Sequence, residues 1–252
     1  MLITSKDNET IKEIKKLKEK KYRKEKYIVE GIKMIQEAIQ YDANIELVVY
    51  SEKFGISNVN LEGIKTIEVT ESIFNTLTEV VSPQGILAVI KKNEDSKKID
   101  YSTEFILALD GIQDPGNLGT IIRTADATNL KQIIVSKDTV DTYSPKVIRS
   151  TMGAIFRVNV IETEDLAQEL DNLKKEGFKI ITTSLQTNKS IYDINYNKSV
   201  VVIGNEANGV SDNVYAVSNE KVKIPMLGKA ESLNASVAAS IMMYEYVRQN
   251  VK

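Results

Sequence analysis

The second half of the chain contains short runs that are apolar at most positions rather than at alternate ones. They are FILALD at 105–110, QIIVS at 132–136, FRVNV at 156–160, FKIITTS at 178–184 and SVVVIG at 199–204, with VKIP at 222–225 last. Strands that are apolar on both faces are typical of a parallel sheet covered by helices on both sides. We expect those helices near 117–128, 144–152, 164–176, 209–217 and 232–250.

The first part of the chain has a shorter α/β pattern. Helices are expected near 9–20, 31–40 and 71–80, and strands at 26–30, 45–50, 65–69 and 85–92. The polar stretch KNEDSKKID that follows lacks core residues. The pattern predicts a small α/β domain at 1–93, a linker at 94–101 and a parallel-sheet domain at 102–252.

The composition excludes several kinds of chemistry. The chain has no cysteine and no histidine, which removes disulfides, thiolate catalysis, the commonest general base and most zinc or iron sites. We therefore expect an organic cofactor and no metal. The charged start and the lack of an apolar run of about 18 residues predict a cytoplasmic protein with no membrane segment.

The ends of several predicted strands carry unusual polar sequence. These ends read LALD-GIQDPGNLG, IITTS-LQ, VVIG-NEANGVS and VKIP-MLGKAESLN. In open α/β sheets, ligands bind beyond the carboxyl ends of the strands, so we expect one pocket at this rim. Neither the G-x-G-x-x-G fingerprint nor a P-loop is present, which argues against an ordinary dinucleotide or nucleoside-triphosphate site.

Three of these segments carry a resemblance to a known family. DPGNLGTIIRTADA, VVIGNEANGVS and IPMLGKAESLNASVAAS resemble, in order and spacing, the motifs of the SpoU (TrmH-like) RNA ribose 2'-O-methyltransferases of the SPOUT superfamily. The resemblance covers nearly all of 105–250. YIVEGIKMIQEAI and VVSPQGILAVI are similar to the L30e-like substrate-binding domain of the family's ribosomal-RNA branch.

The resemblance implies a fold, a donor and an acceptor. The fold would contain a deep trefoil knot, and the protein would be a homodimer with its sites near the interface. The donor would be S-adenosylmethionine, and the acceptor would be a ribose 2'-hydroxyl, most often of 23S ribosomal RNA. The enzyme would mainly position the two reactants and assist removal of the hydroxyl proton.

The resemblance also implies site residues. The catalytic positions are Asn117, Arg123, Glu206, Ser232 and Asn234. The cofactor positions are Thr183, Ser184, Leu185, Gly204, Asn205, Ile224, Met226 and Leu233. In the family the arginine is proposed as general base, but a guanidinium resists deprotonation, so Arg123 is either a base or a group that holds an RNA phosphate.

Structural roles are alternatives for the same side chains. Arg123 lies six residues after Asn117, nearly two helical turns on, so both can point to related faces of one helix. It can instead form a salt bridge to Asp126 or Glu206. Ser232 suits the N-cap of the last helix, and Glu206 suits a helix N-terminus. Asn234 inside a first helical turn would require a designated partner.

A basic segment near the start of the chain indicates RNA contact. Residues 11–26 contain nine lysine or arginine side chains and three glutamates, and such groups bind phosphates with little base specificity. We predict RNA contacts for Lys16, Lys20, Lys21 and Arg23, and for Arg149 in the segment similar to the family's S-x-G-A-x-F-R. Tyr22 and Tyr27 are candidates for stacking on unpaired bases, with Tyr27 favoured for the sheet.

Other functions remain as alternatives at the level of the sequence. One is a catalytically silent RNA-binding protein with the same fold, another is a transfer-RNA 2'-O-methyltransferase, and a third is a nicotinamide-dependent dehydrogenase. The dehydrogenase lacks its glycine fingerprint and a catalytic histidine. The modified nucleotide, its base and any requirement for an intact ribosomal subunit are not encoded in these patterns.

Overall fold

The computed structural model describes residues 2–56, 59–93 and 98–250. These residues form two compact units. The first unit holds the described residues up to 93 together with Tyr143–Phe156, and the second holds the rest. The segment Tyr143–Phe156, expected within the second domain, therefore packs with the first unit. Of the predicted linker at 94–101, residues 94–97 lie outside the described residues.

The first unit is built on a five-stranded mixed sheet in the order β1-β4-β3-β5-β2. Its strands are β1 (Leu2–Ile3), β2 (Lys26–Glu30), β3 (Ile45–Ser51), β4 (Thr66–Val69) and β5 (Ile86–Lys91). Its helical elements are α1 (Glu9–Lys16), η1 (Lys20–Tyr22), α2 (Ile32–Gln40), α3 (Glu71–Leu77), α5 (Pro145–Thr151) and η4 (Ala154–Phe156). Ile11, Phe74 and Leu87 belong to its core, which α1 and α3 build with strands of the sheet.

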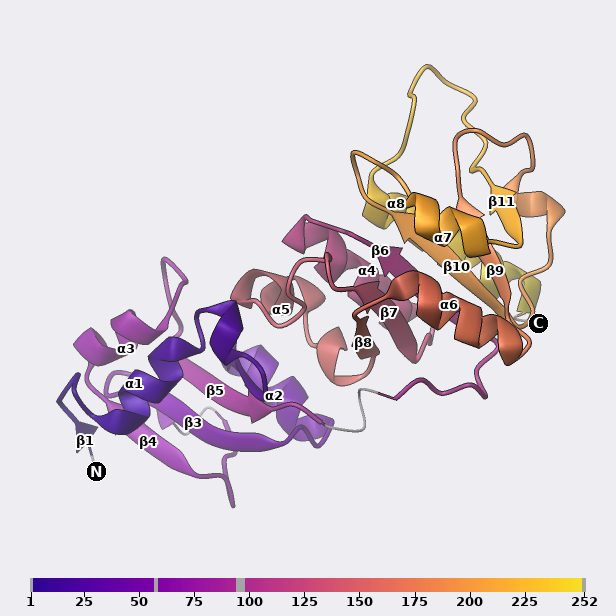
Figure 1. Ribbon diagram of the computed structural model, residues 1–252. Helices are drawn as coiled ribbons and strands as arrows, with labels where there is room; N and C mark the ends of the chain where they lie inside the picture. The colour runs from indigo at the N-terminus through magenta and orange to yellow at the C-terminus, as the bar shows by residue number, and fades with distance from the viewer. Residues whose placement is uncertain (1, 57–58, 94–97, 251–252) are drawn as a thin grey trace. The chain divides into compact units, whose positions relative to one another are not determined.

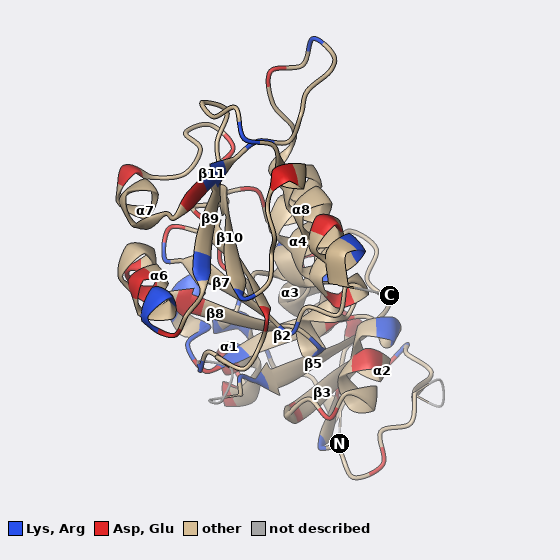
Figure 2. Ribbon diagram, turned by 90° about the vertical axis from the view of Figure 1, so that its right-hand side faces the viewer, with Lys and Arg blue, Asp and Glu red and all other residues tan. Residues whose placement is uncertain are grey.

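The second unit has a six-stranded sheet in which every pairing is parallel, in the order β11-β9-β10-β6-β7-β8. Its strands are β6 (Phe105–Asp110), β7 (Gln132–Ser136), β8 (Asn159–Thr163), β9 (Lys179–Thr183), β10 (Ser199–Gly204) and β11 (Glu220–Val222). Its helical elements are α4 (Pro115–Ala127), α6 (Leu166–Lys175), η5 (Ile191–Asp193), α7 (Asp212–Val217) and α8 (Ala235–Asn250). Helices α6 and α7 cover one face and α4 and α8 the other (Figure 1, Figure 2). The prediction of an α/β protein with a parallel-sheet domain is confirmed.

Several predicted boundaries were wrong. The helix expected at 71–80 ends at Leu77, the helix expected at 209–217 begins at Asp212, and the strand expected at 222–225 lies at Glu220–Val222. The helix expected at 9–20 ends at Lys16, and the buried Arg23 donates to the Leu17 carbonyl oxygen at 2.7 Å. The strand expected at 156–160 lies at Asn159–Thr163, because a 3-10 turn occupies Ala154–Phe156. The last helix begins at Ala235 rather than at 232.

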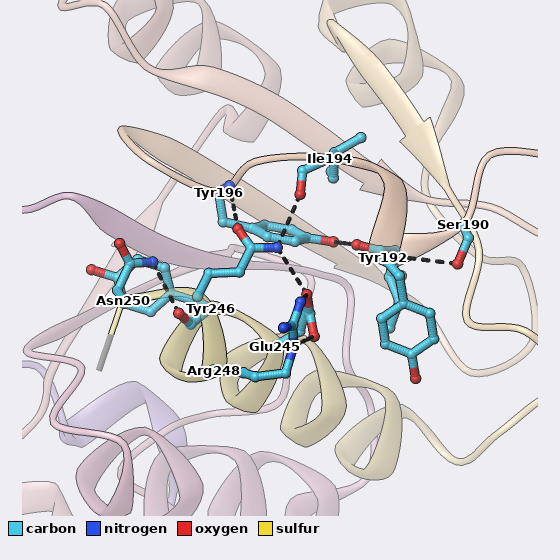
Figure 3. Close-up of polar contacts among 10 residues, drawn as sticks. Ser190, Tyr192, Ile194, Tyr196, Glu245, Tyr246, Arg248 and Asn250 are labelled. Carbon is cyan, nitrogen blue, oxygen red and sulfur yellow. Dashed lines mark hydrogen bonds and ion pairs between the residues drawn. The ribbon is translucent and has the colours of Figure 1, made fainter. Parts of the chain in front are cut away.

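The end of α8 is anchored to the segment that precedes β10 (Figure 3). Gln249 donates to the carbonyl oxygen of Ile194 at 3.0 Å and accepts from the amide of Tyr196 at 3.2 Å. The buried carboxylate of Glu245 accepts from Gln249 and, through both oxygens, from Arg248. Because a buried charge needs such partners, this cluster fixes the position of α8 and hence of the residues at its other end.

Candidate active site

The turn after β6 carries the first polar segment. Gly111 has φ 75°, a left-handed conformation that favours glycine. Asp114 is the N-cap of α4, and its carboxylate accepts from the backbone amide of Asn117 at 2.9 Å. Pro115 occupies the first helical position, where its missing N–H costs nothing. The D-P-G-N sequence is therefore a helix start that fixes where Asn117 emerges.

The turn after β10 carries the second polar segment and lies against the first. The backbone groups of Asn205 and Gly209 form two hydrogen bonds of 2.9 Å, which close the turn. The Asn205 side chain donates to the Gly111 carbonyl oxygen at 2.7 Å. A Cβ at Gly204 would lie 2.2 Å from the backbone of Gly209 and Val210. Only glycine lets the turn fold back this closely.

Glu206 joins the two turns. Its carboxylate accepts from the side-chain amide of Asn117 at 2.9 Å, and from the backbone amides of Gln113 at 3.2 Å and Asp114 at 3.5 Å. Desolvation alone would raise the pKa of Glu206, but the hydrogen bonds outweigh it and hold the pKa below its usual value of 4.5. Glu206 is therefore a carboxylate at neutral pH, with its acceptor capacity directed at the α4 turn.

Asn234 brings in the third segment. Its side-chain oxygen accepts from the backbone amides of Ser236 at 2.9 Å and Val237 at 3.3 Å, so Asn234 caps α8. Its amide nitrogen donates to the side-chain oxygen of Asn117 at 2.9 Å. The N-cap alternative for Ser232 was therefore wrong, because Asn234 holds that position. The sequence predicted that the Asn234 amide has a designated partner, and in the structure that partner is Asn117.

A cavity of about 900 Å³ opens at the carboxyl ends of β9, β10 and β11. All eight predicted cofactor positions line it, namely Thr183, Ser184, Leu185, Gly204, Asn205, Ile224, Met226 and Leu233. Glu206, Ser232 and Asn234 line it as well, whereas Asn117 and Arg123 do not. Asn117 nevertheless touches the cavity wall through its two hydrogen bonds to Glu206 and Asn234.

Arg123 is exposed on α4 and outside this network. Both predicted salt-bridge partners are occupied elsewhere: Asp126 binds Arg157 at 2.9 Å, and Glu206 binds Asn117. Within the described residues Arg123 has no ion pair or hydrogen bond. Six residues correspond to about 600° of helix rotation, so Arg123 points about 120° away from Asn117. The expectation of related faces was wrong, since the two side chains leave α4 in directions about 120° apart.

The predicted RNA-binding residues of the first unit divide into two groups. Lys16 and Lys21 are exposed and form ion pairs with Glu13 and Glu19, while Lys20 is exposed with no pair among the described residues. Arg23 does not belong to this surface, because it is only 6% exposed.

Two other candidates for RNA contact in the first unit, Arg149 and Tyr27, are partly or fully buried. Arg149 is half-buried on α5, which packs in the first unit. Tyr27 is buried against the ring of Tyr143 at a centroid distance of 4.6 Å, and burial raises its pKa. Tyr27 is therefore a sheet residue, as favoured.

Sequence reasoning missed several contributors. Gln113 links the α4 turn to Glu206 through its backbone and to the loop after β7 through its side chain, which donates to the Asp138 carbonyl oxygen. Lys15 and Lys24 are exposed and have no ion pair or hydrogen bond among the described residues. A polar residue directly before the D-P-G-N helix start was the available signal for Gln113.

The described ranges contain neither a metal-binding cluster nor a membrane-spanning helix. No group of three or more acidic, histidine or cysteine side chains there could hold a metal ion. None of the helices there has the length and apolar character needed to cross a membrane.

Comparisons with known proteins agree with this geometry. The model of the SpoU rRNA Methylase family matches residues 104–244, and that of the MRM3-like substrate binding domain matches residues 8–88. The chain is 33% identical over 245 residues to the 23S rRNA (guanosine(2553)-2'-O)-methyltransferase RlmP of Bacillus subtilis, covering 96% of this chain and 97% of that protein.

Two solved structures are similar over almost the whole chain. One is the AdoMet-bound rRNA methyltransferase from Sinorhizobium meliloti, with TM-score 0.87, 28% identity, and coverage of 100% of this chain and 99% of that one. The other is the SpoU methyltransferase AviRb from Streptomyces viridochromogenes in complex with AdoMet, with TM-score 0.85, 25% identity, and coverage of 97% and 99%. The family model matches more than half of this chain, and the Bacillus subtilis relative aligns over nearly the full length of both proteins. The chain therefore belongs to the SpoU methylase family.

Proposed function

We propose that this protein transfers the methyl group of S-adenosylmethionine to a ribose 2'-hydroxyl of RNA, with large-subunit ribosomal RNA as the substrate. The observation that carries the proposal is the cavity whose wall holds all eight predicted cofactor positions and ends at the Asn117–Glu206–Asn234 network. Its volume of about 900 Å³ lies within the range of roughly 300–1,000 Å³ that is usual for small-molecule sites.

The residues present fit this cofactor by their chemistry. Leu185, Ile224, Met226 and Leu233 provide apolar surface for an adenine ring, while the turns after β9 and β10 provide backbone groups. S-adenosylmethionine, when bound, supplies an activated sulfonium methyl group. Because the donor is already activated, the site needs no histidine and no metal, and the chain's own residues position the acceptor.

The Asn117–Glu206–Asn234 network holds the acceptor side of the site rigid. Each of the three side chains forms at least one hydrogen bond to a residue of another segment. The Arg123 guanidinium has no partner in the described part of the chain and is available to bind an RNA phosphate. In this proposal Arg123 orients the ribose and stays protonated, because a guanidinium resists deprotonation. The hydroxyl proton passes to water late in the transfer, as the methyl group moves to the 2'-oxygen.

A homodimer belongs to the same proposal, together with the knotted threading of the second unit. Helices α4 and α8 lie side by side, and the hydroxyls of Thr124 and Ser240 are 3.1 Å apart. The outer face of α8 exposes Val237 (46%) and Tyr244 (53%). Two exposed apolar side chains on α8, which packs beside the helix that carries the exposed Arg123, are suited to contact with a second copy.

RNA capture by the first unit completes the proposal. Exposed lysines Lys15, Lys20 and Lys24 have no carboxylate partner among the described residues. They belong to the same basic segment as Tyr22, which is 42% exposed. The Lys21 ammonium lies 4.8 Å from the centre of the Tyr22 ring. Basic groups beside an exposed aromatic ring are suited to binding single-stranded or looped RNA. We propose that the protein acts in the cytoplasm.

The decisive experiment is methyl mapping of ribosomal and transfer RNA from cells with and without this protein. Loss of one 2'-O-methyl group in large-subunit ribosomal RNA, restored by the purified protein with S-adenosylmethionine, is the expected result. A missing methyl group in transfer RNA would redirect the substrate. Binding of S-adenosylhomocysteine with no methyl incorporated into any cellular RNA would favour a silent RNA-binding protein, and binding of NAD alone would reject the proposal.

A further inference from the structure

A pair of lysines in the cavity wall is not explained by the residues described so far. Lys221 lies on β11, and Lys223 follows it in extended backbone that pairs with Ser190. Val222 between them is fully buried. Side chains alternate along an extended chain, so Lys221 and Lys223 project to the same side, with their Cα atoms about 7 Å apart. Both residues line the cavity.

Neither lysine is neutralised within the described part of the chain. The Lys221 ammonium lies 4.6 Å from the centre of the Tyr215 ring, and the Lys223 ammonium lies 3.5 Å from the side-chain oxygen of Asn188. Neither forms an ion pair there. The nearby Lys189, in contrast, binds the Glu220 carboxylate at 2.8 Å and does not line the cavity.

The cavity lining contains two carboxylates, Glu206 and Asp212, and neither neutralises the two lysines within the described residues. Glu206 is engaged by the turn before α4 and by Asn117. Asp212 is the first residue of α7, where the helix dipole favours a negative charge. Neither pairs with Lys221 or Lys223 within 4.0 Å among the described residues, so the two ammonium groups keep their capacity for a ligand.

We infer that Lys221 and Lys223 form an anion subsite at the β11 end of the cavity. Two ammonium groups on one side of an extended segment repel each other unless an anion lies between or beside them. The strand order places this subsite two strands from β10, hence roughly 10 Å from the turn that holds Glu206. An anion bound there belongs to the far end of a ligand whose reacting atom lies near Glu206.

The chemistry is an oxyanion, carboxylate or phosphate, and it has two sources in this enzyme. One is the carboxylate of the amino-acid arm of the cofactor, and the other is a backbone phosphate of the acceptor RNA. This inference rests on the proposed function for the identity of these two ligands. The experiment therefore has one arm for each source.

The first arm measures binding of S-adenosylhomocysteine and of 5'-methylthioadenosine, which lacks the carboxylate, by calorimetry. The variant Lys221→Met/Lys223→Met keeps the aliphatic stems and removes both charges. If the cofactor is the source, S-adenosylhomocysteine binding weakens at least tenfold and 5'-methylthioadenosine binding is unchanged. The matched control is Lys189→Met, and Lys221→Arg/Lys223→Arg should restore binding.

The second arm measures binding of ribosomal RNA from cells lacking the protein, at several salt concentrations. If the RNA is the source, S-adenosylhomocysteine binding is unchanged, RNA binding weakens at least tenfold, and the slope of log affinity against log salt falls by about 1 to 2. Unchanged binding in both arms would overturn the inference, and so would an equal loss for both nucleosides. Failure of the wild-type protein to bind S-adenosylhomocysteine would instead contradict the proposed function.

Discussion

Asn117 connects Glu206 to Asn234: its amide nitrogen donates to the carboxylate of Glu206 at 2.9 Å, and its oxygen accepts from Asn234 at 2.9 Å. The three residues come from the start of α4, the turn after β10 and the start of α8. An asparagine suits the centre of this network, because its amide nitrogen can donate to a carboxylate while its amide oxygen accepts from a second amide.

Replacing Asn117 by aspartate should therefore harm the site more than its small change in size indicates. The new carboxylate cannot donate to Glu206 and repels it at hydrogen-bond distance. We expect methyl transfer to fall about 10- to 100-fold, matching the roughly 1.5–3 kcal/mol of a hydrogen bond to a charged group. Single-turnover rates measure the effect. Asn172→Asp on α6, where the side-chain oxygen only accepts from Gln168, is the control and should keep its rate.

Substitutions of Asn234 should separate its structural role from its role in the network. Asn234→Ala removes the cap and should cost about 1 kcal/mol of the free energy of unfolding. Asn234→Ser keeps a capping oxygen but loses the donor to Asn117. We expect near-normal stability in denaturant titrations with reduced methyl transfer. A serine variant with full activity would show that the bond to Asn117 is dispensable.

Removal of the Arg123 side chain should abolish turnover without affecting the fold. Because Arg123 has no partner among the described residues, Arg123→Ala should change the free energy of unfolding by less than about 0.5 kcal/mol. Cofactor affinity should stay within about tenfold, or roughly 1.4 kcal/mol.

Arg157→Ala is the matched control for that variant. This variant removes the Nε that donates to both carboxylate oxygens of Asp126. We expect it to lose about 1 kcal/mol of stability and to retain turnover. Near-normal turnover in Arg123→Ala would remove Arg123 from the proposed mechanism.

Glycine at position 204 should be essential to the cavity. Gly204→Ala places a Cβ 2.2 Å from the backbone of Gly209 and Val210, so the turn after β10 must move. We expect a loss of about 1–3 kcal/mol in stability and weaker S-adenosylhomocysteine binding. Gly228→Ala is the comparison, because no atom lies within 4 Å of its added Cβ. Equal effects in the two variants would contradict this assignment.

Acid should weaken the link between the turns through Glu206. Its pKa is lower in the folded protein than the usual 4.5, so its contribution to stability is present above the unfolded pKa and is lost as the pH falls through the folded pKa. Glu206→Gln should therefore be less stable than the wild type at pH 7. The difference between their unfolding midpoints should shrink below about pH 4.5, and a difference that is constant with pH would exclude this contribution.

The sequence alone determined the parallel sheet and the place of the site. Continuous apolar runs such as SVVVIG can be buried only between two helical layers, and polar segments that follow parallel strands must meet at one rim. This reasoning predicted one pocket at the rim, whereas the individual cofactor positions, from Thr183 to Leu233, came from the resemblance to the SpoU motifs.

Only the tertiary structure decided which partners those residues take. The buried Arg23 donates a hydrogen bond to the carbonyl oxygen at the end of α1, and Asn234 rather than Ser232 caps α8. Arg123 has no partner among the described residues, because Arg157 binds Asp126. Propensity and periodicity act over a few residues, whereas these hydrogen bonds join residues far apart in the chain or depend on where a helix ends. Such choices are settled by competition among partners that come into contact only when the sheet has assembled.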